Sequence, residues 1–78
     1  MKHDDLKAIY NFLYRERYTT EADPTYFIRK KTGIDIFDDG LVLVWRLGGE
    51  LIGEFKAQSY ASFVKKYRQL EQEKWGLN

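Results

Sequence analysis

Hydrophobic residues recur along residues 4–18 at the spacing of one helix face. Because an α-helix has about 3.6 residues per turn, side chains at i, i+3, i+4, i+7 and i+8 share a face. The apolar side chains at these positions are Leu6, Ile9, Tyr10, Leu13 and Tyr14. Asp4 and Asp5 would lie in the first turn, where the helix dipole favours acids. The pattern predicts a helix over residues 4–18, with an apolar arc broad enough to contact more than one element.

A second amphipathic pattern begins at Ser59. Serine is a favoured N-cap residue, and Gly76 follows the last apolar position, where glycine commonly ends a helix. The expected buried stripe consists of Tyr60, Phe63, Val64, Tyr67, Leu70 and Lys74 or Trp75. We expect a long C-terminal helix over residues 59–75.

The segment between these helices and the glycine-rich centre has two interpretations. Asp23 could cap a helix that has Pro24 at its first position, bases in its last turn and Gly33 at its end. This pattern predicts a short helix over residues 24–31. Thr, Tyr, Phe and Ile all favour β-structure, however, so a strand through residues 25–29 stays open as the alternative.

Two glycine turns, Asp39-Gly40 and Gly48-Gly49, punctuate the central part of the chain. They predict a three-stranded antiparallel meander of residues 34–38, 41–47 and 51–56. Two-residue turns would pair Ile36 with Leu43, Trp45 with Ile52, Leu43 with Glu54 and Val42 with Phe55. A three-residue loop would shift the pairing by one residue and turn a strand over, so the face assignment depends on loop length.

With two-residue turns, the sheet has a core face and a second face that is also apolar. The predicted core face carries Ile34, Ile36, Leu41, Leu43, Trp45, Leu47 and Ile52. The second face could be covered by one of the helices, or by a protein partner if both long helices pack on the first face. The residues predicted to bind a partner there are Phe37, Val42, Val44, Arg46, Leu51 and Phe55. Aromatic side chains and arginine commonly anchor such interfaces.

Composition places the chain among small globular domains. Its 78 residues predict one domain, residues 1–78, and 44% hydrophobic with 17% aromatic residues argue against disorder. The absence of cysteine excludes a disulfide framework and thiolate metal sites, and favours a cytoplasmic location. The longest apolar run, Leu41 to Trp45, is far too short for a membrane span, so we expect no membrane contact.

No motif in the sequence carries specific catalytic chemistry. The single histidine, His3, lies beside Asp4 and Asp5 at the N-terminus, where adjacent side chains do not converge on one metal ion. Ser59 and Ser62 lack a plausible base. We therefore predict no catalytic residue, no metal site and no cofactor, and we do not expect an enzyme.

A nucleic-acid-binding regulator is the alternative function. The formal net charge is only +1, but bases cluster with aromatic residues in two segments. The candidate phosphate-binding residues are Arg29, Lys30, Lys31, Lys65, Lys66 and Arg68.

One short pattern resembles a DNA-binding fold. The run from Ile52 to Phe55, with Ala61 six residues later at a helix start, is similar to the hairpin-then-helix end of AP2-type and integrase arm-binding domains. The resemblance implies a sheet that reads the major groove with Arg, Lys and Trp. Acids such as Asp35, Glu50 and Glu54 depart from that pattern, so the likeness is confined to the hairpin-helix arrangement.

The sequence thus predicts an α+β domain without enzymatic activity. Its expected function is protein binding or regulation, by self-association as a homodimer or by binding a protein target.

Overall fold

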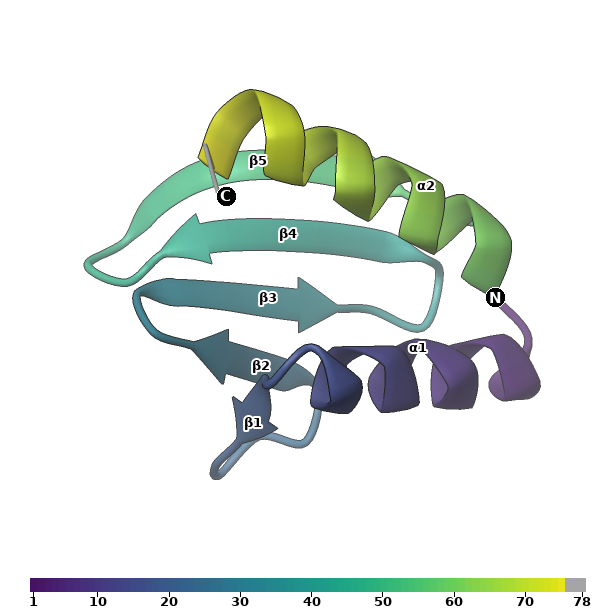
Figure 1. The fold of residues 1–78 in the computed structure, drawn as a ribbon. Helices are drawn as coiled ribbons and strands as arrows, with labels where there is room; N and C mark the ends of the chain where they lie inside the picture. Colours follow the sequence, from purple (N-terminus) through teal and green to yellow (C-terminus); the bar gives the residue numbers. More distant parts are fainter. Residues whose placement is uncertain (76–78) are drawn as a thin grey trace.

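The protein is an α+β domain in which two helices pack on one face of a five-stranded antiparallel sheet. The computed structural model describes residues 1–75, the last two by their backbone alone. The elements are α1 (His3–Arg15), β1 (Thr19–Thr20), β2 (Tyr26–Arg29), β3 (Thr32–Ile36), β4 (Leu41–Arg46), β5 (Glu50–Lys56), α2 (Tyr60–Leu70) and the π-helical turn η1 (Glu71–Trp75). The strands form a meander in the order β1-β2-β3-β4-β5 (Figure 1). The two long helices predicted at the ends of the chain are confirmed, but the sheet has five strands and not three.

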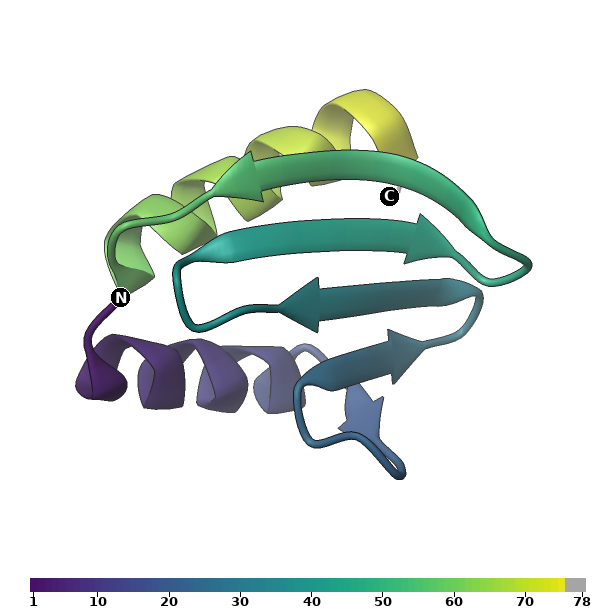
Figure 2. The same cartoon turned by 180° about the vertical axis from the view of Figure 1, so that it is seen from behind.

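Both helices lie on the same face of the sheet, so the domain has two layers. Figure 1 shows α1 and α2 in front of the strands, and Figure 2, from behind, shows the strands uncovered. The start of α1 is tied to the start of α2, because the Tyr60 N–H donates to Asp5 Oδ1 at 3.0 Å. Ser59 accepts from the Ser62 N–H as the N-cap of α2, which confirms the predicted cap. The expected stripe position at Lys74 or Trp75 and the terminating Gly76 lie outside the described side chains.

The first helix ends three residues earlier than the pattern predicts. The N–H of Arg17 donates to Tyr14 O, and the N–H of Tyr18 donates to Leu13 O. These two bonds form a Schellman C-cap, with Arg17 in the left-handed position at φ 75°. The turn redirects Tyr18 into the core, where its side chain is 1% exposed. The apolar spacing at residue 18 therefore reflects core packing and not a continued helix.

The predicted short helix over residues 24–31 is wrong, and the alternative strand is correct. The Asp23 carboxylate accepts from the Thr25 N–H at 2.9 Å and from the Thr25 hydroxyl at 2.8 Å. These two bonds also lower the pKa of Asp23. They close a tight turn that leads into β2, so Asp23 stabilises a turn and does not cap a helix. Lys30-Lys31 then forms the two-residue hairpin turn between β2 and β3.

The hairpin between β3 and β4 has a three-residue loop. The Phe37 N–H donates to Leu41 O and the Gly40 N–H donates to Phe37 O, both at 2.9 Å. Gly40 is left-handed at φ 94°, as expected for a type I turn closed by a bulge residue. Ile36 therefore pairs with Val42, and the predicted pairing of Ile36 with Leu43 is wrong by one residue. This shift turns β4 over.

The hairpin between β4 and β5 contains two irregularities that cancel. A three-residue loop pairs Arg46 with Glu50, and a bulge then leaves Ile52 unpaired between Leu51 and Gly53. The predicted pairing of Trp45 with Ile52 is therefore wrong. Beyond the bulge the register returns to the expected one, so the predicted pairs Leu43 with Glu54 and Val42 with Phe55 are confirmed.

The helices cover the face that holds the valines of β4, and not the face that holds Trp45. Ile34 and Ile36 lie in the core as predicted, and Ile52 packs against it, but the predicted core positions Leu41, Leu43, Trp45 and Leu47 do not. The buried core consists of Ile9, Phe12, Leu13, Tyr18, Phe27, Ile34, Ile36, Val42, Val44, Ala57, Phe63 and Tyr67. One-residue register shifts exchange the two faces of a strand, which explains the correction.

Two buried tyrosines make stability depend on alkaline pH. The hydroxyls of Tyr18 and Tyr67 lie 3.0 Å apart, and burial is the main cause that raises the pKa of both. Their ordinary pKa is about 10, so above pH 10 the unfolded chain releases protons that the folded chain retains. The contribution of these tyrosines to folding stability is complete below about pH 10 and is lost as the pH rises above it. We expect the free energy of unfolding to decline by up to about 1.4 kcal/mol per pH unit for each tyrosine.

Urea unfolding between about pH 8 and pH 11, from roughly two units below the ordinary pKa of tyrosine to one unit above it, measures this decline. Tyr18→Phe removes one of the two groups and should reduce the alkaline slope. Tyr14→Phe is the control, since Tyr14 is 48% exposed. A stability that stays level across the range would contradict the prediction.

Candidate functional site

The uncovered side of the sheet, which we call the open face, carries a continuous group of apolar side chains. Side chains alternate between the two faces along each strand, so the residues next to the buried positions point to the open face. The observed register shows which of them lie side by side. The open face consists of Tyr26, Ile28, Asp35, Phe37, Leu41, Leu43, Trp45, Leu51, Glu54 and Lys56. Figure 2 looks onto it and shows no helix in front of the strands.

Two aromatic side chains at the centre of the open face are held in place. The Trp45 Nε1–H donates to Asp35 Oδ2 at 2.8 Å, which orients the indole across neighbouring strands. Tyr26 lies over Gly33, where a Cβ atom would overlap the phenol ring. Tyr26 belongs to β2 and Trp45 to β4, and Gly33 of β3 pairs with Trp45, so the phenol crosses β3 and lies beside the indole. The chain thus presents two preorganised aromatic groups on an uncovered surface.

The six residues predicted to bind a partner do not lie on one surface. Phe37 and Leu51 belong to the open face and are 44% and 43% exposed. Val42 and Val44 are fully buried beneath the helices. Phe55 packs against Phe63 of α2, with ring centroids 5.8 Å apart.

The sixth residue, Arg46, lies on the helix-covered side at the end of the sheet. Its Nε atom lies 3.2 Å from Glu50 Oε1 in an exposed ion pair. Arg46 pairs across the sheet with Thr32, which pairs in turn with Arg29. This row of the sheet is not covered by α1 or α2.

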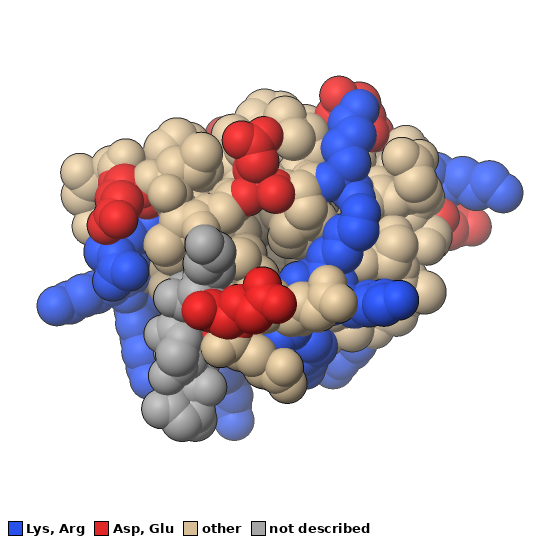
Figure 3. All heavy atoms as spheres, turned by 90° about the horizontal axis from the view of Figure 1, so that it is seen from above, with Lys and Arg blue, Asp and Glu red and all other residues tan. Residues whose placement is uncertain are grey.

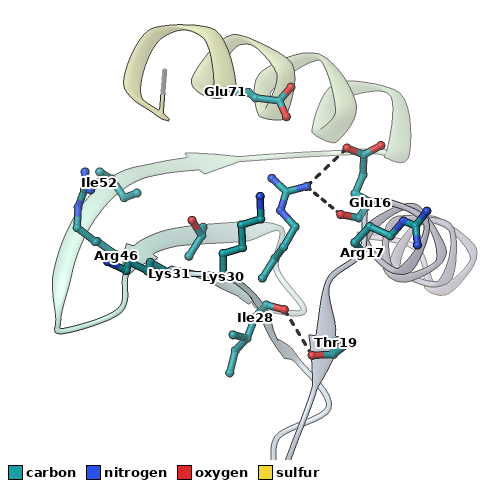
Figure 4. Close-up of a pocket in the computed structure, with 11 residues that line it drawn as sticks. Glu16, Arg17, Thr19, Ile28, Lys30, Lys31, Arg46, Ile52 and Glu71 are labelled. Atoms are coloured by element: carbon teal, nitrogen blue, oxygen red, sulfur yellow. Dashed lines mark hydrogen bonds and ion pairs between the residues drawn. The ribbon is translucent and has the colours of Figure 1, made fainter. Parts of the chain in front are cut away.

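A wide cleft opens over that row. Its volume is about 1000 Å³, and it lies between the end of α1, the hairpins at this end of the sheet and η1 (Figure 4). We call it the basic cleft. The residues that line it are Glu16, Arg17, Thr19, Ile28, Arg29, Lys30, Lys31, Thr32, Arg46, Ile52 and Glu71.

The six bases predicted as phosphate contacts are divided between two regions. Arg29, Lys30 and Lys31 line the basic cleft. Arg68 binds the Glu16 carboxylate through both terminal nitrogens at 3.2 Å. The hydrogen bonds to Glu16 and then to Glu71 raise the pKa of Arg68, so this arginine is committed to ion pairs.

The other two bases lie on α2, away from the cleft lining. Lys66 donates to the carbonyl oxygen of Lys56, and Lys65 is exposed. Seen from above, acidic and basic side chains are interspersed on the surface (Figure 3). The structure therefore brings three of the six bases together and leaves the others apart.

The described residues offer no metal centre. No group of three His, Asp or Glu side chains within the described residues is placed to hold an ion. His3 borders a shallow hollow of about 400 Å³ with Leu6, Lys7, Tyr10 and Asp38. Among the helices described, none has the length and apolar character needed to cross a membrane.

The sequence reasoning missed Tyr26, Trp45 and Arg17. Tyr26 falls within the predicted short helix, because Asp23-Pro24 resembles a helix start. Trp45 falls on the predicted core face, because a two-residue loop before β4 is one residue too short. A readable signal was present, since Asp38-Asp39-Gly40 fits a three-residue loop that ends in glycine. Arg17 carried no comparable signal, because its position depends on where α1 ends.

Comparison with protein-family models, curated proteins and solved structures found no match to this chain.

Proposed function

We propose that this protein is a non-enzymatic protein-binding domain, that the open face is its binding surface, and that a second copy of the chain is the partner. The observation that carries the proposal is the packing of both helices on one side of the sheet (Figures 1 and 2). The opposite side keeps Tyr26, Leu43 and Trp45 at the surface, each partly exposed. Monomeric proteins seldom leave such a contiguous apolar group uncovered.

The small size of the domain favours self-association over a transient contact. A chain of 78 residues has a limited core, and natural domains of this size are often stabilised by disulfides, metals or oligomerisation. Cysteine is absent, and the described residues hold no metal-binding group. Pairing of two open faces would supply the missing burial.

The composition of the open face suits a symmetric interface. Trp45 and Tyr26 are the residue types that most often anchor interfaces, and both are held in position before binding. Glu54 and Lys56 bring opposite charges to the same surface on β5. In a two-fold dimer each of these charges could face its opposite on the other copy.

Leu51→Asp tests the proposal. Leu51 pairs with Trp45 and is 43% exposed, so a charge there should leave the fold intact. We expect wild-type protein to approach twice the 9.3 kDa mass of one chain in light scattering at high concentration. The variant should weaken the dimer by about 2 kcal/mol, a factor of roughly thirty, because a buried interface would contain an unpaired charge.

Ala61→Asp is the matched control. Ala61 is exposed on α2, on the other side of the molecule, and the substitution adds the same charge. It should leave the mass of the dimer unchanged. A wild-type protein that is monomeric at every concentration, or a dimer that both variants weaken equally, would contradict the proposal.

A further inference from the structure

The acids of the basic cleft are already neutralised by an internal network. Glu16 and Glu71 both bind Arg68, at 3.2 Å and 3.0 Å, and Glu16 also lies 3.9 Å from Arg29. Arg68 is not part of the cleft lining. The acids therefore do not offset the remaining bases, and the cleft keeps a positive charge.

Three of those bases make no ion pair among the described residues. They are Arg17, Lys30 and Lys31, which all line the cleft, and no dashed line in Figure 4 joins any of them to an acid. The Arg17 guanidinium is turned away from Lys30, toward α1, in that view. Arg46 adds a fourth charge, since its only described ion pair, with Glu50, is solvent-exposed and weak.

Arg29 provides a fixed donor group at the floor of the cleft. Its Nη1–H donates to the Glu16 carbonyl oxygen at 2.8 Å, and its guanidinium lies 4.5 Å from the centre of the Tyr18 ring. The side chain is only 19% exposed. A guanidinium has five N–H donors in a planar fork. Only one of them makes a hydrogen bond within the described residues, so the others can bind an anion bidentately.

The backbone gives a second, independent reason to expect a ligand. Arg17 and Lys30 have φ angles of 75° and 54°, and among the described residues they alone are left-handed without being glycine. Each stands where glycine would be less strained, directly after the C-cap of α1 and at the first position of a two-residue hairpin turn. Both are cationic and both line the same cleft. Strain kept at two cationic positions of one cleft points to a binding role.

We propose that the basic cleft binds a phosphate-bearing anion of nucleotide size. Several cations around one arginine fork suit a ligand with two or more negative charges. The cleft volume of about 1000 Å³ is at the upper end of the range for small-molecule sites, and it leaves space beside Ile52 for an organic group. This proposal does not depend on the dimer, because the bases that carry it are not part of the open face.

Titration of the full chain with pyrophosphate, ATP and adenosine tests the proposal. We expect pyrophosphate and ATP to shift the amide resonances of Arg17 and of residues 29–32, and adenosine to bind far more weakly. The affinity for ATP should fall as salt is added, because the contacts are electrostatic.

Lys30→Gly separates binding from folding. The substitution removes a charge from the cleft and also relieves the left-handed strain at this position. We expect about tenfold weaker ATP binding together with an unchanged or higher melting temperature. A purely structural lysine would not combine these two effects.

Lys65→Ala is the matched control, because it removes the same charge from the exposed surface of α2. It should leave the affinity for ATP within about twofold. Absence of shifts with both phosphate ligands at low salt would overturn the proposal. So would equal losses in the two variants, or a single-stranded oligonucleotide that binds much more tightly than ATP and loses affinity in Lys65→Ala.

Discussion

Val44→Lys should prevent this protein from folding, whereas Leu43→Lys, one residue earlier, should be tolerated. Val44 is fully buried between the sheet and the helices, and its cross-strand neighbours are Ile34 and Gly53. A lysine there would leave an unpaired charge in an apolar core and would remove the packing of the valine. We expect a loss of roughly 3–5 kcal/mol, comparable with the whole stability of a small domain.

Leu43 is the matched position on the open face. It lies between Asp35 on β3 and Glu54 on β5 in the observed register. A lysine there would have an acid on each side, and cross-strand pairs of opposite charge contribute roughly 0.2–1 kcal/mol each. Thermal unfolding followed by circular dichroism compares the two variants. If Leu43→Lys proved the more damaging, the face assignment of β4 would be wrong.

The elements with strong periodic patterns were predictable from the sequence. Both terminal helices and the Ser59 cap depend on contacts within a few residues, so the local pattern contains most of the information. The end of α1 could not be predicted, because Arg17 takes a conformation that usually favours glycine. Tyr18 fits the helical spacing by coincidence, because the turn at Arg17 and not a continued helix directs its side chain into the core.

The strands were harder, because a loop length decides what each side chain faces. The two glycine turns were read correctly as turns, and both contain one residue more than assumed. At the second turn the bulge at Ile52 compensates, and the pairs beyond it match the prediction. At the first turn nothing compensates, so Val42 and Val44 exchange places with Leu43 and Trp45.

This exchange explains which part of the candidate site was foreseeable. The sequence predicted a second apolar sheet face and left open whether a helix would cover it. The structure has an uncovered apolar face, but it lies on the opposite side of β4. Of the residues predicted from strand alternation to bind a partner, Phe37 and Leu51 do lie on that side, and both are exposed there. The basic cleft was not foreseeable as a site, because it assembles Arg17, Lys30 and Arg46 from three separate turns and strand ends.

Gly40→Ala should be the most damaging of the glycine substitutions in the turns between strands. Gly40 is left-handed at φ 94°, and a Cβ atom there would overlap the carbonyl oxygen of Ala57. That contact cannot be relieved cheaply, since Ala57 is fully buried and its N–H donates to Gly40 O at 2.9 Å. The loop before β4 and the connection from β5 to α2 would have to separate. We expect a loss of roughly 2–4 kcal/mol, measured by urea unfolding.

Gly48→Ala distinguishes the clash from the backbone conformation. Gly48 is also left-handed, at φ 116°, but a Cβ atom there would meet nothing within 4 Å. The free energy of unfolding of this variant should fall only by the cost of placing alanine in a left-handed conformation, about 1–2 kcal/mol. Equal losses in the two variants would mean that the Gly40 contact with Ala57 adds nothing. A larger loss for Gly40→Ala would show that the three-residue loop is held against the β5–α2 connection, and that this packing helps to maintain the register that turns Trp45 toward the open face.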